Sequence, residues 1–159
     1  MLKRTLPILA LGAVTATPAP AQTSLWEAAA APVMQDNGPP YCHMTQSDGT
    51  RLISFSVQPG TWSIGVYASA LKGMDTKIEA TLQIGNGPTY SLTMMGGGGG
   101  YTVNLTSDGM ATVLDALILY GDEETRLTVG SESELVIPAD GTQDAARTMW
   151  DCRADLPEG

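Results

Sequence analysis

The sequence predicts a mainly β protein: an antiparallel β-sandwich or partly open barrel of six to seven strands, with two short helices at residues 109–119 and 141–152. Three observations lead to this class. Apolar and polar residues alternate through most of residues 41–105, as they do in half-buried strands. Turn-forming pairs that contain Gly or Pro separate these stretches. Clear helical spacing of apolar residues occurs twice, both times in the later part of the chain.

The first 21 residues have the features of a cleavable signal peptide. Lys3 and Arg4 precede an apolar stretch, residues 6–16, that is too short to span a bilayer. Ala19 and Ala21 give the small-X-small pattern that signal peptidase recognises, so we expect a cut after Ala21. The alternative is an apolar terminus that is disordered or joins the core. No later stretch is long and apolar enough for a transmembrane segment, and we expect a soluble periplasmic or secreted protein.

The charge balance is strongly acidic and argues against two classes of partner. The chain has 17 acidic and 8 basic residues, a formal net charge of −9. Loss of Lys3 and Arg4 with the signal peptide would make it more acidic still. Nucleic acids and anionic membranes both bind clustered Lys and Arg, so neither is an expected partner.

The remaining chain is expected to form a flexible linker over residues 22–40 and one β-rich domain over residues 41–159. A short helix at residues 24–31 is an option within the linker, because Ser24 precedes Glu27 at the spacing of a capping box. The two cysteines, Cys42 and Cys152, predict a disulfide that closes a loop of about 110 residues, since an isolated pair in an oxidising compartment is most simply bridged. A free, reactive or metal-binding thiol is the alternative.

The strands follow in order from residue 41. Residues 41–46 and 51–57 flank the turn signal SDG and predict a hairpin. Residues 61–68 come next, and residues 76–84 show the clearest alternation, with apolar side chains at every second position. The turn at residues 85–88 then leads into two further alternating stretches, which five consecutive glycines separate.

The helices are predicted from a change of period. Apolar side chains at positions 110, 113, 114, 117 and 118 share one helix face. Ser107 or Asp108 is the expected N-cap of this helix, and Gly121 the expected stop. Short strands at residues 125–129 and 134–138 precede the second helix, for which Asp140 or Thr142 is the expected N-cap.

The five glycines, Gly96 to Gly100, are interpreted as a flexible hairpin tip. A phosphate-binding loop would need a Lys and a Ser or Thr after the glycines, but Tyr101 follows Gly100 and a strand pattern follows Tyr101. A lid over a ligand face is the alternative that would give these glycines a function.

Few other residues point to chemistry. His43, the only histidine, lies beside Cys42 and Met44, and imidazole with thioether ligands suits copper, so His43 and Met44 are the candidate metal ligands. A surface position for His43 and core positions for the methionines are the simpler interpretation. The acidic stretches at residues 121–125 and 131–134 lack the spacing of a calcium loop and are interpreted as solvated loops.

The order of these features resembles the invasion-associated locus B group of small bacterial periplasmic proteins. The features that match are the leader, the early Cys42, the strands LISFSV and WSIGVYA, the helix MATVLDALIL and the ending MWDC. The resemblance implies an envelope-associated β-sandwich and supplies no catalytic residues.

We therefore expect an exported, non-enzymatic binding or interaction protein of the bacterial envelope, without a cofactor. Its partner would be another envelope protein or a small ligand. One alternative is a small envelope enzyme or a protease inhibitor, and the other is a periplasmic copper-binding protein that uses His43 and methionines.

Overall fold

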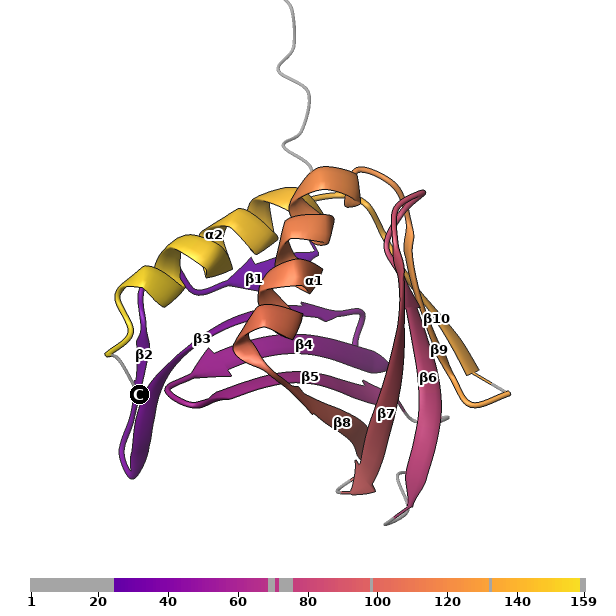
Figure 1. The fold of residues 1–159 in the computed structure, drawn as a ribbon, viewed down its shortest axis with the longest axis horizontal. Helices are drawn as coiled ribbons and strands as arrows, with labels where there is room; N and C mark the ends of the chain where they lie inside the picture. The colour runs from indigo at the N-terminus through magenta and orange to yellow at the C-terminus, as the bar shows by residue number, and fades with distance from the viewer. Residues whose placement is uncertain (1–24, 69–70, 72–75, 98, 132, 158–159) are drawn as a thin grey trace, which may run out of the picture.

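The protein is a curled antiparallel sheet that holds two helices on its inner face. The computed structural model describes residues 25–68, 71, 76–97, 99–131 and 133–157. In these residues one sheet has the strand order β1-β3-β4-β5-β8-β7-β6-β9-β10, with β2 paired to β3. The sheet curls as a half-barrel, and α1 and α2 lie side by side on its concave side (Figure 1). The predicted class is confirmed, but the described residues contain ten strands rather than six or seven.

The strands are β1 (Trp26–Ala28), β2 (Val33–Gln35), β3 (Gly38–Ser47), β4 (Arg51–Gln58), β5 (Thr61–Ala68), β6 (Lys77–Gln83), β7 (Thr89–Gly97), β8 (Gly100–Leu105), β9 (Thr125–Val129) and β10 (Ser133–Ile137). The helices are α1 (Ser107–Tyr120) and α2 (Thr142–Ala154). Both helix predictions are confirmed to within two residues at each end.

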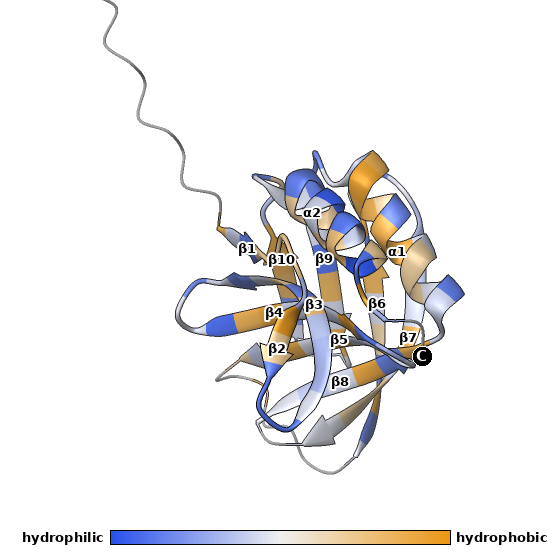
Figure 2. Ribbon diagram, turned by 90° about the vertical axis from the view of Figure 1, so that its left-hand side faces the viewer, coloured by the Kyte–Doolittle hydropathy of each residue, from blue (hydrophilic) through white to orange (hydrophobic). Residues whose placement is uncertain are grey.

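The inner face of the sheet forms the core: hydrophobic and hydrophilic residues follow one another along the strands (Figure 2), and the buried ones are mainly hydrophobic. In β6 the side chains of Ala80 and Leu82 are buried, whereas those of Glu79 and Thr81 are exposed, as the alternation predicts. The strand register aligns large apolar side chains across neighbouring strands, because Met44, Phe55, Ile64 and Val103 occupy paired positions. The first three of these four are fully buried.

Helix α1 packs its apolar stripe against the middle of the sheet. Leu114 and Leu117 are fully buried, and the helix contacts β5 and β8. The N-cap is Thr106, not Ser107 or Asp108: Thr106 has extended backbone, and its hydroxyl accepts a hydrogen bond from the Gly109 N–H at 3.1 Å. The expected stop at Gly121 is confirmed.

Helix α2 begins differently from the prediction. Its N-cap is Gly141, which has a left-handed backbone (φ +77°) and no side chain to cap the helix. Asp140 and Thr142 were the expected caps. The Thr142 hydroxyl is used elsewhere, because it accepts a hydrogen bond from Trp26 Nε1 at 2.7 Å and donates one to the Pro138 carbonyl at 2.9 Å.

The described part of residues 22–40 is not a linker, and the helix expected at residues 24–31 does not form. β1 pairs with β3, so that Trp26 lies opposite Gln46 and Ala28 opposite Met44. The Trp26 ring is 8% exposed and packs 6.1 Å from the Phe55 ring. Burial of this ring and pairing with β3 override the helix propensity of the alanines.

The glycine run is mostly strand rather than a five-residue tip. β7 extends to Gly97 and β8 begins at Gly100, which pairs with Gly97. Gly99 has a φ of +88°, in the region that favours glycine, and Gly98 lies outside the described residues. A Cβ on Gly100 would collide with the Tyr67 ring and the Val66 carbonyl. At Gly100, close packing under Tyr67 therefore requires glycine.

The buried stripe of α1 gives a stability prediction with a control on the same helix. Leu114→Ala should lower the free energy of unfolding by about 2–5 kcal/mol, because it removes buried methyl groups and leaves a cavity. Leu119, which is 66% exposed, serves as the control, and Leu119→Ala should change the value by less than about 0.5 kcal/mol. Chemical denaturation measures both. Equal effects would mean that the stripe does not pack on the sheet.

Gln46 gives a second prediction, because its buried amide is unpaired. The side chain is 1% exposed, and neither amide atom has a hydrogen-bond partner among the described residues. Gln46→Met keeps the shape and removes the unpaired amide, so the free energy of unfolding should stay the same or rise by up to about 1–3 kcal/mol.

The matched control is Gln83, whose amide donates to the carbonyls of Gly85 (3.1 Å) and Gly87 (2.8 Å). Gln83→Met should lower the free energy of unfolding by about 1 kcal/mol in the same denaturation experiment. A larger loss for Gln46→Met than for Gln83→Met would show that the Gln46 amide has a partner, such as an internal water.

Candidate functional site

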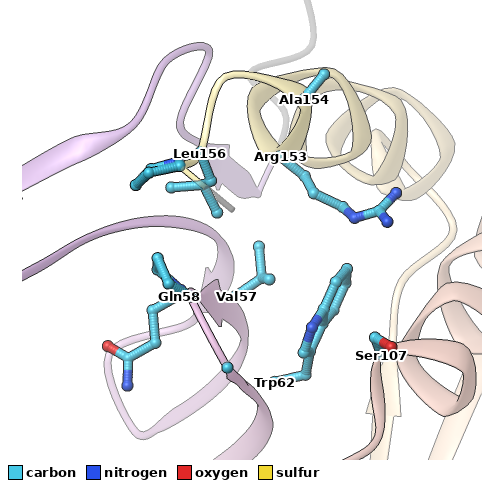
Figure 3. A pocket seen from close by; sticks show the side chains of 10 residues that line it. Val57, Gln58, Trp62, Ser107, Arg153, Ala154 and Leu156 are labelled. Atoms are coloured by element: carbon cyan, nitrogen blue, oxygen red, sulfur yellow. The ribbon is translucent and has the colours of Figure 1, made fainter. Parts of the chain in front are cut away.

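A hollow at one end of the half-barrel is the candidate binding site. We call it the Trp62 pocket. Its volume is about 400 Å³, and it lies where the β4–β5 turn, the first residue of α1 and the last turn of α2 meet (Figure 3). Its wall includes Val57, Pro59, Trp62, Ser107, Arg153 and Leu156.

The β4–β5 hairpin places two of the wall residues side by side. Pro59 and Gly60 form its two-residue turn, with Gly60 at a φ of +74°, and the flanking residues pair across it. Proline followed by a glycine with positive φ is the pattern of a type II turn. The register sets Val57 opposite Trp62, and both side chains are buried on the inner face, with Trp62 7% exposed.

The disulfide fixes the α2 side of the pocket. Cys42 and Cys152 are bonded, with Cα atoms 6.0 Å apart, which confirms the predicted bridge. Cys42 lies opposite Val57 in the β3–β4 register, and Val57 lies opposite Trp62. The bridge therefore attaches α2 to the same row of residues that lines the pocket, and Arg153 is the next residue along the helix.

Arg153 supplies the positive charge of the pocket. Its guanidinium carbon lies 5.0 Å from the ring centroid of Trp62 and 4.9 Å from that of Trp150. At these distances the ring faces attract the cation. Figure 3 shows the side chain extending from α2 towards Trp62 and Ser107.

Arg153 differs from the other arginines that the structure describes. Arg51, Arg126 and Arg147 each pair with a carboxylate. Within the described residues Arg153 has no carboxylate at ion-pair distance and no hydrogen-bond acceptor. A guanidinium carries five N–H donors in its plane, so contacts with ring faces leave donors on its edge without partners.

His43 and Met44 do not form a site together. Consecutive strand residues point to opposite faces. Met44 is fully buried in the core, whereas His43 lies on the outer face of β3, where its ring stacks on Tyr41 with centroids 5.3 Å apart. Other methionines with fully buried side chains also belong to the core: Met94, Met110 and Met149. Among the described residues, no group of three or more His, Cys, Asp or Glu side chains could hold a metal ion.

The outer face of β3 and β4 carries a second hollow. It has a volume of about 470 Å³, and its wall includes Tyr41, His43, Thr45, Ser54 and Ser56. We call it the outer groove. Its wall combines one aromatic stack with small hydroxyl groups and carries no Arg, Lys, Asp or Glu.

The structure brings the two acidic stretches together around one arginine. Arg126 on β9 lies 3.4 Å from a carboxylate oxygen of Glu124 and 3.4 Å from one of Glu134. All three side chains are about half exposed, so this group is a solvated surface network. Arg126 lies on β9, Glu134 on β10 and Glu124 just before β9, and none of the three lines the Trp62 pocket.

Sequence reasoning did not single out Arg153 as a candidate site residue. One local signal was available: Trp150 and Arg153 are three residues apart, a spacing that brings side chains together on a helix, but the helix was predicted to end at residue 152 and α2 extends to Ala154. Nothing local connects Arg153 to Trp62, because that contact depends on how α2 docks on the sheet.

The disulfide gives a prediction about stability. Replacement of both Cys42 and Cys152 by Ala should lower the free energy of unfolding by about 4–5 kcal/mol, because the unfolded chain regains the freedom of the long loop. Chemical denaturation measures this loss. Reduction should destabilise the wild type by a similar amount and leave the double variant unchanged. A variant as stable as the oxidised wild type would contradict the assignment of the bridge as a structural constraint.

Comparisons with known proteins do not place this chain in a family. A scan against family models, a search of curated proteins and a search of solved structures each gave no significant match. Neither α1 nor α2, the two helices of the described residues, is long and apolar enough to cross a membrane.

Proposed function

We propose that this chain is an exported, non-enzymatic binding protein of the bacterial envelope that holds a small ligand in the Trp62 pocket. One observation carries the proposal: in a hollow of about 400 Å³, Trp62 lies beside Arg153, a cation that pairs with no carboxylate of the described residues. Pockets of about 300–1,000 Å³ with apolar walls and few polar groups are typical small-molecule sites.

The chemistry of the pocket favours recognition over catalysis. An arginine guanidinium stays protonated at physiological pH, so Arg153 is unsuited to proton transfer. Ser107 would need a nearby base to act as a nucleophile. His43 lies across the sheet in the outer groove. The envelope enzyme predicted as an alternative would therefore need a base from outside these residues.

The proposed location rests on the leader and the disulfide. Lys3, Arg4 and the apolar stretch after them have the pattern of a signal peptide. Disulfides persist mainly in oxidising compartments such as the periplasm. The resemblance to the invasion-associated locus B group leads to the same proposal.

Export can be tested directly on the full chain. Expressed in a Gram-negative bacterium, the protein should accumulate in the periplasm with Gln22 as its first residue, because the expected cut follows Ala21. Mass spectrometry of the purified protein reads this terminus. A variant that lacks residues 2–21 should stay in the cytoplasm. Full-length protein retained in the cytoplasm would refute the location.

Binding can be tested without any substitution. We expect small aromatic and aliphatic fragments, screened against isotope-labelled protein by nuclear magnetic resonance, to shift the indole N–H of Trp62 and the amide of Arg153. The amides of Tyr41 and His43 report on the outer groove and serve as the internal control. Shifts confined to Tyr41 and His43, or no binding fragments, would refute the assignment of the Trp62 pocket.

A further inference from the structure

We infer that the Trp62 pocket selects small amphipathic molecules with a monoanionic carboxylate head, which Arg153 binds through the free edge of its guanidinium. This inference rests on the proposed function, because it names the ligand class of the same pocket. It goes further in assigning Arg153 as the residue that determines specificity.

The first step is the state of Arg153 before any ligand binds. Its guanidinium carbon lies 5.0 Å from the Trp62 ring centroid and 4.9 Å from that of Trp150, and no carboxylate of the described residues pairs with it. Its N–H donors therefore have no partner among these residues, and the ring contacts favour one position of the side chain. A planar guanidinium matches a carboxylate with two parallel hydrogen bonds. Because Arg153 has no acceptor among the described residues, a ligand carboxylate would displace no internal partner.

The second step is the shape of the rest of the pocket. Val57 and Leu156 form an apolar wall on the side away from the Arg153 guanidinium (Figure 3). At about 30 Å³ per water molecule, a volume of about 400 Å³ accommodates roughly a dozen non-hydrogen atoms. A ligand of that size could place a charged end against Arg153 and an apolar body against Val57 and Leu156.

The third step is the charge around the pocket. Asp151 precedes Arg153 by two residues on α2, Asp155 is the C-cap residue of that helix, and Asp108 lies in the first turn of α1. The whole chain carries a net charge of −9. The described lining of the pocket contains Arg153 and no other Arg or Lys, so the second charge of a dianion would have no cationic partner there. The surroundings therefore favour a carboxylate over a phosphate monoester.

The experiment compares three probes on the wild-type protein by isothermal titration calorimetry. The probes are 4-phenylbutanoate, its isosteric amide 4-phenylbutanamide, and 3-phenylpropyl phosphate. We expect 4-phenylbutanoate to bind with one-to-one stoichiometry. We expect the amide to bind at least about 10-fold more weakly, since it cannot form the charged hydrogen bonds. We expect 3-phenylpropyl phosphate to bind more weakly than 4-phenylbutanoate.

Two variants assign the charge to its residue. Arg153→Gln should lower the affinity for 4-phenylbutanoate by at least about 10-fold and leave the affinity for 4-phenylbutanamide nearly unchanged. Arg147→Gln removes the same charge from the same helix, at a half-exposed position paired with Asp144, and should leave both affinities unchanged. Circular dichroism and thermal melts check that both variants fold, and the probe series on the wild type stands independently of either variant.

The outcomes separate this inference from the proposed function. If 4-phenylbutanamide binds as tightly as 4-phenylbutanoate, or Arg153→Gln binds both as the wild type does, carboxylate selection is refuted while the pocket remains a binding site. If the phosphate binds more tightly, the assignment to a monoanion is refuted. If none of the probes binds and the fragment screen also finds no ligand, both proposals fail.

Discussion

The structure depends on burial of α1 inside the curl of the sheet. An antiparallel sheet with one apolar face must cover that face, and a sheet that curls needs side chains to fill its concave side. Met110, Leu114 and Leu117 do this from one helix, and all three are fully buried. α2 then packs against α1, β1 and β3, which closes the core on the side of the first strands.

The Trp62 pocket lies where α1 and α2 stop covering the inner face of the sheet. α1 begins at Ser107 and α2 ends at Ala154, and both ends lie beside the β4–β5 turn. Trp62 therefore has one part in the core and one part against the pocket. Each contact of Arg153 with an indole is worth about 0.5–2 kcal/mol, enough to favour one position of a long side chain without using its hydrogen bonds.

The environment of Arg153 differs from that of the other described arginines in this acidic chain. Arg126 and Arg147 lie among carboxylates at the surface, where their charge is compensated. At Arg153 two aromatic rings lie near the cation, and no carboxylate of the described residues pairs with it. A ring attracts a cation through its face and supplies no hydrogen-bond acceptor of the carboxylate kind, so the N–H groups of Arg153 differ in this respect from those of the paired arginines.

The sequence predicted those features that depend on a local period. Alternation at residues 77–83 correctly assigned the inner and outer faces of β6, and the helical stripe correctly placed Leu114 and Leu117 in the core. The cysteine bridge was predicted because two cysteines allow one intramolecular pairing.

The features that the sequence did not predict depend on contacts between distant residues. β1 has three residues, too few for a period to show, and it exists because β3 offers it a partner. Gly96 and Gly97 read as a loop by composition, yet pairing with β8 extends β7 through both. The Trp62 pocket is the clearest case, because Trp62 and Arg153 lie on elements that meet only when α2 docks on the sheet.

The bridge between Cys42 and Cys152 also closes residues 42–152 into a covalent ring. Every element from β4 to β10, with α1 among them, lies within this ring. Cleavage of one peptide bond inside it opens the ring but releases no fragment, because the two pieces remain joined through the sulfur atoms. Re-pairing of the cut strands is then an event within one molecule, independent of protein concentration. For a protein proposed to function in the bacterial envelope, a single nick would leave a complete, still connected sheet.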